Sequence, residues 1–317
     1  MKRKRTGLLV YCLVLAAFSI YFLLDTFVIT RVYSQEATAV QAVETVTTES
    51  SSGKKLKTAS TQTSDNPSSN KAQTVLSTEN TYSDEDIQIT LTEYRVSDTT
   101  IYVADVQLSS AEYLKTALAK NSYGKNVTAK TSTIASGVNA ILAINGDYYG
   151  SQEKGYVIRN GVLYRNTAVS GRQDLVIYKD GSFGIINESD ISAEELLANG
   201  AQQVLSFGPA IIQNGSIAVS TQFEVGKAMA SNPRTAVGVI DDLHYVFVVS
   251  DGRTSKSEGL SVYELADFMQ SLGVQTAYNL DGGGSSTMYF NGQVVNNPTT
   301  NGTIKERSVS DIVYIGY

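Results

Sequence analysis

The residues best suited to chemistry lie at positions 279–287, which read Asn-Leu-Asp-Gly-Gly-Gly-Ser-Ser-Thr. A short apolar run, residues 274–280, precedes the carboxylate of Asp281. Successive glycines carry a large entropic cost, so a folded protein keeps them where the backbone takes a positive φ or closely approaches another group. With a carboxylate before the glycines and hydroxyl groups after them, this stretch predicts a site for a polar, oxygen-rich ligand.

Two further aspartates follow apolar runs and lie beside glycine. Asp147 follows residues 140–144, and Asp251 follows residues 244–250. A capped helix separates the run before Asp251 from the run before Asp281, which predicts a strand–helix–strand unit with parallel strands. Because ligands bind at the carboxyl ends of the strands in open α/β sheets, we expect all three aspartates to converge on one pocket.

Short β-prone runs dominate the remainder of the chain. Residues 154–164 and 175–186 are typical of hairpins, and capping boxes predict helices that begin near residues 109, 192 and 261. The first of these helices is expected to extend towards residue 120. The sequence therefore predicts an α+β fold, with mixed twisted β-sheets and a few helices, in which the strand–helix–strand unit carries the site loops.

The N-terminal residues predict a location. Lys2-Arg3-Lys4-Arg5 precede an apolar run over residues 8–24, whose length approaches the ~20 residues that cross a bilayer. The basic cluster predicts a cytoplasmic N-terminus. We therefore predict a signal-anchor transmembrane helix within residues 1–30, in a single-pass protein of the cell membrane whose remaining chain is extracellular. The alternative is a cleaved signal peptide and a secreted protein.

Beyond the N-terminal helix the composition divides the chain in two. Residues 31–82 are rich in Ser and Thr and poor in large apolar residues, which predicts a disordered stalk. Residues 83–317 suffice for one folded catalytic domain. Cys12 is the sole cysteine, and an extracellular domain without disulfides is typical of a Gram-positive surface. The formal net charge of −6 argues against nucleic acid as a partner.

Taken together, the motifs resemble those of the phosphodiester glycosidase family, the family of the uncovering enzyme, in a bacterial, membrane-anchored form. The resemblance runs over residues 85–317 and rests on short motifs in the family's order, at residues 143–149, 207–210, 232–238, 251–253 and 279–287 and at Arg307. It implies an extracellular hydrolase that cleaves the glycosidic bond of a sugar-1-phosphodiester of the N-acetylglucosamine-1-phosphate type. It further implies a carbohydrate phosphodiester substrate within a cell-surface glycopolymer or exopolysaccharide.

Cleavage at an anomeric carbon requires a base or a nucleophile, and phosphate is a good leaving group once its charge is stabilised. Asp147, Asp251 and Asp281 are the candidate catalytic residues. The candidate substrate-binding residues are arginines for the phosphate, asparagines for sugar hydroxyls, and backbone N–H groups that form an anion-binding nest. These are Arg234, Arg253 and Arg307; Asn145 and Asn279; and Gly282, Gly283, Gly284 and Ser285.

Other readings of the same residues stay open. Three aspartates with asparagine oxygens form a hard-ligand set suited to Ca²⁺ or Mg²⁺, although no cofactor is certain. One alternative function is a metal-dependent phosphodiesterase that attacks phosphorus. The other is a non-catalytic glycan-binding module on the same fold.

Overall fold

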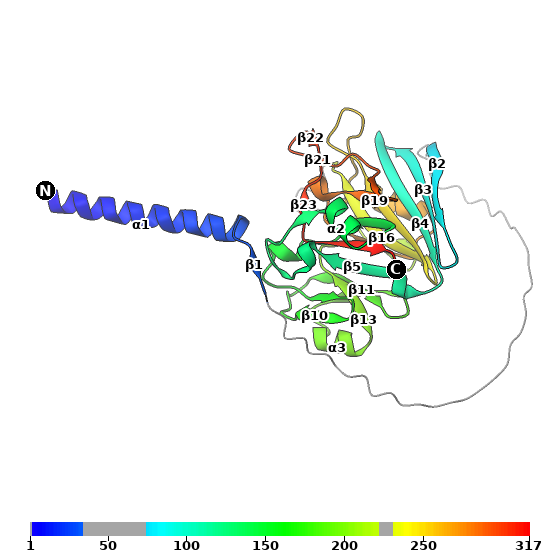
Figure 1. Cartoon of the computed structure of the whole chain (residues 1–317), viewed down its shortest axis with the longest axis horizontal. Coiled ribbons are helices and arrows are strands. Elements are labelled where there is room, and N and C mark those ends of the chain that lie inside the picture. Colours follow the sequence, from blue (N-terminus) through cyan, green and yellow to red (C-terminus); the bar gives the residue numbers. More distant parts are fainter. Residues whose placement is uncertain (1, 34–73, 222–230) are drawn as a thin grey trace, which may run out of the picture.

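The computed structural model describes residues 2–33, 74–221 and 231–317 (Figure 1). The N-terminal helix α1, Lys2–Phe27, extends away from the folded part (Figure 1). It is followed by β1, Arg31–Val32, which pairs with β6, Gly124–Lys125. Most of the predicted stalk, residues 31–82, lies outside the described residues. Strand β2, Thr74–Ser83, covers the last nine of these positions and pairs with β3.

The largest sheet has eight strands, and each recorded pairing within it is antiparallel. From one edge to the other its strands are β15 (Ser216–Ile217), β14 (Ala210–Gln213), β18 (Thr276–Asn279), β16 (Arg234–Asp241), β17 (His244–Ser250), β4 (Thr99–Leu108), β3 (Ile87–Val96) and β2. Strands β2 to β4 form the cyan edge at the right of Figure 1.

Two five-stranded sheets complete the framework. The first, in order, contains β20 (Gln293–Val294), β19 (Met288–Phe290), β8 (Leu142–Asn145), β24 (Asp311–Ile315) and β5 (Leu114–Leu118). The second contains β10 (Val162–Arg165), β9 (Val157–Arg159), β13 (Ala201–Leu205), β11 (Gln173–Tyr178) and β12 (Phe183–Asn187). Two short pairs, β21 (Thr299–Thr300) with β22 (Thr303–Ile304) and β23 (Ser308–Val309) with β7 (Ala129–Lys130), lie outside these sheets.

Helices α2 (Thr131–Gly137), α3 (Ala193–Ala198) and α4 (Val262–Ser271) pack on the sheets. Ser261 and Glu264 form the expected capping box at the start of α4. Its apolar face, which includes Leu265, Phe268 and Met269, belongs to a buried cluster on one side of the large sheet. The predicted α+β fold is confirmed.

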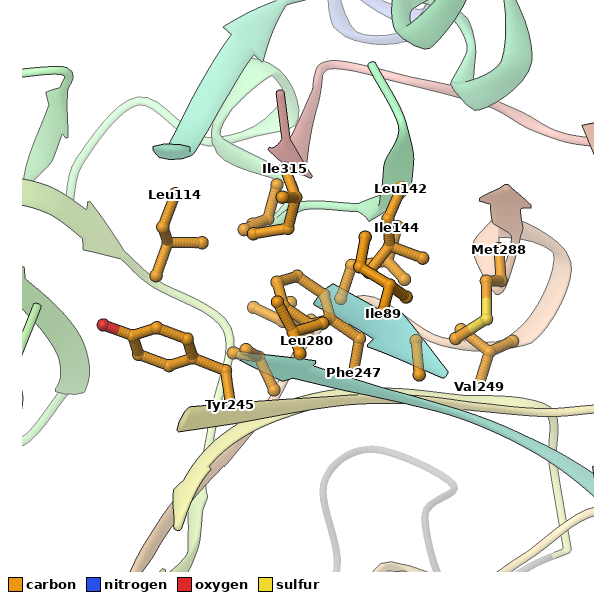
Figure 2. Packing of buried hydrophobic residues seen from close by; sticks show 14 of the residues in the cluster. Ile89, Leu114, Leu142, Ile144, Tyr245, Phe247, Val249, Leu280, Met288 and Ile315 are labelled. Atoms are coloured by element: carbon orange, nitrogen blue, oxygen red, sulfur yellow. The ribbon is translucent and has the colours of Figure 1, made fainter. Parts of the chain in front are cut away.

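The main core lies between the large sheet and the sheet that contains β8 (Figure 2). Phe247 and Val249 from β17 meet Leu142 and Ile144 from β8 and Ile315 from β24 in this core (Figure 2). Strand β17 alternates its side chains between this core and the α4 cluster, so nearly all of its residues are buried. This explains why its sequence is a continuous apolar run rather than an alternating one.

The predicted strand–helix–strand unit consists of β17, α4 and β18. Strand β16 lies between β17 and β18 and is antiparallel to both, so these two strands run parallel without being neighbours. The carboxyl ends of β17 and β18 therefore meet the amino end of β16 at one edge of the sheet. That edge carries Asp251, Asp281 and Arg234.

The predicted hairpins are formed by β9 with β10 and by β11 with β12. The helix expected from residue 109 towards residue 120 is wrong. Ser110 caps only a short 3₁₀ turn, Ala111–Tyr113, after which β5 pairs with β24. Tertiary pairing at Leu114–Leu118 prevails over the local capping signal.

The predicted membrane location is not supported. A membrane-spanning helix requires about 20 consecutive apolar residues. Within the part of the chain that the structure describes, no helix is both long and apolar enough to cross a membrane. This finding contradicts the predicted single-pass anchor at the cell membrane.

The packing of Phe247 generates a stability prediction. Its side chain is completely buried in the main core, and deletion of a buried phenylalanine ring costs about 3–5 kcal/mol. We expect Phe247→Ala to lower the free energy of unfolding by this amount in urea denaturation followed by circular dichroism. Ile304→Ala is the control, because Ile304 is 66% exposed and its loss should change stability by less than about 0.5 kcal/mol. Similar losses in both variants would contradict the assigned core.

Candidate active site

The site is built at the edge where β16, β17 and β18 meet. Pro233 lies between the two loops that leave β17 and β18: its nitrogen would be 2.6 Å from a Cβ at Gly252, and its carbonyl oxygen 2.9 Å from a Cβ at Gly282. Asp281 N–H donates to Gly146 O at 3.4 Å, which brings the loop after β8 to the same place. The three aspartate loops therefore converge, as the sequence predicts.

The glycine turn is crowded by two guanidinium groups. A Cβ at Gly283, where φ is +62°, would lie 3.0 Å from Arg253 Nη2. A Cβ at Gly284 would lie 2.9 Å from Arg307 Nη2 and 2.6 Å from Thr300 Oγ1. The positive φ favours glycine at residue 283, and at both positions the absence of a side chain lets the arginines lie directly against the backbone that follows Asp281.

A third arginine contributes positive charge from within the protein. Arg234 is buried and donates from Nε to Leu260 O at 2.7 Å. Burial, assisted by the positive charge of nearby Arg253, lowers the pKa of Arg234 to about 10. Arg253 is exposed and donates from Nε and Nη2 to Asn232 Oδ1. Like charges held so close together favour an anion beside them.

Asp281 is the carboxylate that belongs to this turn. Burial raises its pKa, and the Ser285 hydroxyl, the charge of Arg307 and the Gly282 N–H oppose that rise. Its backbone carbonyl accepts from Asn145 Nδ2 at 2.7 Å, so the start of the turn is fixed. A partly desolvated carboxylate beside cationic groups can serve as a base or as a nucleophile.

Asp147 has a different environment from the one expected of a catalytic base. It is 1% exposed. Its Oδ1 accepts from Tyr149 N at 2.9 Å, and its Oδ2 accepts from Arg159 Nη2 at 2.8 Å and from Ser206 N at 2.9 Å. These bonds hold the loops that carry Tyr148 and Phe207, whose rings pack edge to face with centroids 4.9 Å apart. Asp147 is therefore placed to position these aromatic side chains.

The Asp251 carboxylate is also hydrogen-bonded within the protein through both of its oxygens. Its Oδ1 accepts from Asn297 N at 2.8 Å and from Asn296 Nδ2 at 3.3 Å, and its Oδ2 accepts from Asn297 Nδ2 at 2.8 Å. It is 4% exposed. These bonds secure the loop after β20 against the end of β17. They give Asp251 a structural role, which is the alternative to a catalytic one.

The two candidate asparagines lie behind the site rather than on its surface. Asn145 is fully buried, and its Oδ1 accepts from Thr235 Oγ1 at 2.9 Å and Thr287 N at 3.3 Å. Asn279 is 1% exposed and donates from Nδ2 to Gly208 O at 2.8 Å. Both fasten neighbouring loops, and this geometry does not support their predicted contact with sugar hydroxyls.

Most N–H groups of the predicted backbone nest already donate hydrogen bonds within the protein. Gly283 N–H donates to Pro233 O at 2.8 Å and Ser285 N–H donates to Gly282 O at 3.3 Å. The Gly282 N–H lies against the Asp281 carboxylate, whose pKa it lowers. The side chains of Arg253 and Arg307, rather than a row of N–H groups, are therefore the main candidates for binding an anion. For the residues that the structure describes, no cluster of three or more His, Cys, Asp or Glu side chains could hold a metal ion.

A family comparison adds to this geometry. A family model described as phosphodiester glycosidase matches residues 138–316, more than half of the chain. The chain belongs to the phosphodiester glycosidase family. The family and the enzyme class predicted from the sequence, a phosphodiester glycosidase of the hydrolases, are confirmed.

Two individual relatives share less than 30% sequence identity with this chain over the aligned residues. The SPbeta prophage-derived uncharacterized protein YomE of Bacillus subtilis (strain 168) is 28% identical over 183 residues, which cover 56% of this chain and 28% of YomE. N-acetylglucosamine-1-phosphodiester alpha-N-acetylglucosaminidase of Mus musculus is 29% identical over 175 residues, which cover 50% of this chain and 33% of that enzyme. The chain thus spans about a third or less of the length of these curated relatives.

Among solved structures, the zebrafish N-acetylglucosamine-1-phosphodiester alpha-N-acetylglucosaminidase catalytic domain, auto-inhibited by its pro-peptide, superposes with a TM-score of 0.58. It is 21% identical, and the superposition covers 78% of this chain and 88% of that one. A hypothetical protein from Synechocystis superposes with a TM-score of 0.54 at 16% identity, over 73% of this chain and 62% of that protein. These similarities establish the fold.

Sequence reasoning missed several residues that shape the site. Arg159 lies in a hairpin turn of ordinary composition, and its role as partner of both Asp147 and Asp311 appears only in three dimensions. Tyr148 and Phe207 lie within the family motifs, but neither was a candidate. Their position next to recurring glycine and aspartate residues was the available signal.

The environment of Asp147 generates the second prediction. Removal of one partner from a buried ion pair costs about 3–5 kcal/mol, and Asp311 still pairs with Arg159 when the charge at residue 147 is lost. We expect Asp147→Asn to lower the free energy of unfolding by about 3 kcal/mol in urea denaturation. KM should also rise at temperatures where the variant remains folded, because the Tyr148–Phe207 wall loses its anchor.

Asp242→Asn, at an exposed position, is the matched control and should unfold like the original protein. Unchanged stability together with complete loss of kcat in Asp147→Asn would instead show that Asp147 acts directly on the substrate.

Proposed function

We propose that this protein hydrolyses a sugar-1-phosphodiester of the N-acetylglucosamine-1-phosphate type at the anomeric carbon. The observation that carries the proposal is the placement of Arg253 and Arg307 against the Gly283–Gly284 backbone, next to Asp281. Two exposed guanidinium groups beside one partly desolvated carboxylate fit a phosphodiester joined to a sugar. Family membership and the printed activity of the mouse relative support the same substrate class.

The proposed reaction breaks the bond between the anomeric carbon and the phosphate oxygen. The electron pair of that bond remains with the phosphate, which leaves as a phosphomonoester, and water supplies the hydroxyl group of the freed sugar. Arg253 and Arg307 stabilise the charge on the leaving phosphate, so a strong general acid is not required. Asp281 acts on the opposite side of the anomeric centre, as base or as nucleophile.

The proposal also retains an extracellular glycopolymer or exopolysaccharide as the substrate, without the membrane anchor. The basic and apolar N-terminal residues, which also fit a cleaved signal peptide, and the absence of a cysteine beyond Cys12 support this part of the proposal. A phosphodiesterase that attacks phosphorus remains the alternative reaction, and it would release a sugar phosphate instead of the free sugar.

Products and one substitution test the reaction together. We expect the full-length protein to convert the methyl phosphodiester of N-acetylglucosamine 1-phosphate into free sugar and methyl phosphate. Phosphorus NMR would identify the phosphate product. Asp281→Asn should lower kcat at least roughly 100-fold, the lower range for loss of general acid–base catalysis. Asp267→Asn, exposed on α4, should retain activity as the control.

The same assay with EDTA reports on metal dependence, since a site based on arginines should keep its rate. N-acetylglucosamine 1-phosphate among the products would mean attack at phosphorus and would refute the proposed reaction.

The arginine pair generates a separate prediction. Hydrogen bonds to charged groups contribute about 1.5–3 kcal/mol, which corresponds to roughly 10- to 100-fold in rate. We expect Arg253→Gln and Arg307→Gln each to lower kcat/KM by that factor. Lys179→Gln serves as the control because Lys179 is exposed in the turn between β11 and β12. If both site variants retained full kcat/KM, the phosphate would have to bind elsewhere.

A further inference from the structure

A cleft of about 540 Å³ is lined by residues that contact the strand leading to Asp281. This volume falls within the range of roughly 300–1,000 Å³ that is typical of small-molecule sites. One wall is the loop at residues 169–173, and another is the stretch at residues 207–210. Ala218 and Val219 contribute apolar surface, while Asn187 and Gln213 contribute amide groups.

Direct contacts join this cleft to the catalytic turn. Gly208, in the cleft wall, accepts from Asn279 Nδ2 at 2.8 Å and donates its N–H to Asn279 O at 3.1 Å, two residues before Asp281. Phe207, also in the wall, packs against Tyr148. The charges of both Arg172 and Asp281 act on the Tyr148 hydroxyl, whose pKa is raised mainly by burial. Tyr148, which packs on the cleft wall through Phe207, is therefore near enough to both the cleft arginine and the candidate catalytic carboxylate for their charges to reach it.

The walls of the cleft are rigidly connected. The Tyr278 hydroxyl donates to Gln173 O at 2.7 Å and accepts from Phe207 N at 3.0 Å, so one buried side chain joins both walls from beneath. Tyr278 is fully buried. A preformed cleft of this kind binds a ligand without first having to order its own walls.

Arg172 is the single charged residue among those that line the cleft. It donates from Nη1 to Lys154 O at 3.2 Å and lies against Gly155, where a Cβ would be 2.1 Å from Nη1. Over the described residues, no carboxylate lies within ion-pair distance of its guanidinium group. A half-buried arginine held in a cleft that lacks an acidic lining residue suits an anionic ligand.

We infer that this cleft binds the sugar of the substrate and that Arg172 binds a phosphate substituent on that sugar. The inference rests on the proposed function, which places the scissile phosphate at Arg253 and Arg307 and the anomeric carbon at Asp281. The sugar ring then passes the Tyr148–Phe207 wall and enters the cleft. Each internal sugar of a phosphate-linked glycan carries such a second phosphate, so this site would let the enzyme cleave within such chains.

Paired substrates test this assignment with the full-length protein. One is the methyl phosphodiester of N-acetylglucosamine 1-phosphate, and the others carry one additional phosphate on the 4- or the 6-hydroxyl of the sugar. We expect kcat/KM to be roughly 10- to 100-fold higher for one of the phosphorylated substrates, the factor that a charge-assisted hydrogen bond supplies. Arg172→Gln should reduce this preference to about one, and Arg172→Lys should restore part of it.

Lys179→Gln, at an exposed position, controls for the general loss of a positive charge and should keep the preference. Melting temperatures of the Arg172 variants separate a local effect from unfolding, because misfolding would lower kcat/KM for all three substrates equally. Equal kcat/KM for neutral and phosphorylated sugars in the original protein, or a preference that survives in Arg172→Gln, would overturn the inference alone. No turnover of any of these diesters would refute the proposed function itself.

Discussion

A single buried guanidinium group joins two of the three large sheets. Arg159, at the end of β9, forms ion pairs with Asp147 after β8 and with Asp311 in β24, and all three side chains are almost completely buried. A buried charge is tolerated only where it is paired and hydrogen-bonded, so these sheets can pack in one relative position. Asp147 then transmits that position to the loops of Tyr149 and Ser206, and so to the aromatic wall of the candidate site.

The cost of this arrangement is visible at Asp311. Burial raises the pKa of its carboxyl group to about 7, although the neighbouring Arg159 opposes the rise. Its Oδ1 has no hydrogen-bond partner among the described residues. A Cβ at Gly146 would lie 2.3 Å from that oxygen, so glycine before Asp147 is needed to admit the carboxylate. Part of the family motif around Asp147 is therefore explained by the buried ion pairs rather than by contact with a substrate.

Much of the fold was predictable, and the exceptions have clear physical causes. The capping box at Ser261 and the hairpin turns act through neighbours in sequence, so local patterns found them. The intervention of β16 between β17 and β18, and the conversion of residues 114–118 into a strand, depend on pairing partners far along the chain. No pattern within a short window reports such partners.

The candidate site divides in the same way. Asp281 and the glycine turn were predictable because three glycines in succession need a close neighbour, and the structure supplies Arg253 and Arg307. Asp147 and Asp251 look identical to Asp281 in sequence, as carboxylates at strand ends. Their donors, Arg159 and Asn297, are 12 and 46 residues away, so only the fold distinguishes a carboxylate that secures a loop from one that can meet a ligand.

The proposed catalytic turn and one of the two walls of the cleft belong to different sheets. The turn follows β18 of the large sheet, whereas residues 169–173 precede and begin β11 of the second five-stranded sheet. The hydroxyl of Tyr278 and the Tyr148–Phe207 contact are the bridges between them. A change in the length or charge of the loop at residue 172 can therefore leave the turn at Asp281 in place, so that the proposed sugar site and the proposed cleavage site are structurally separable.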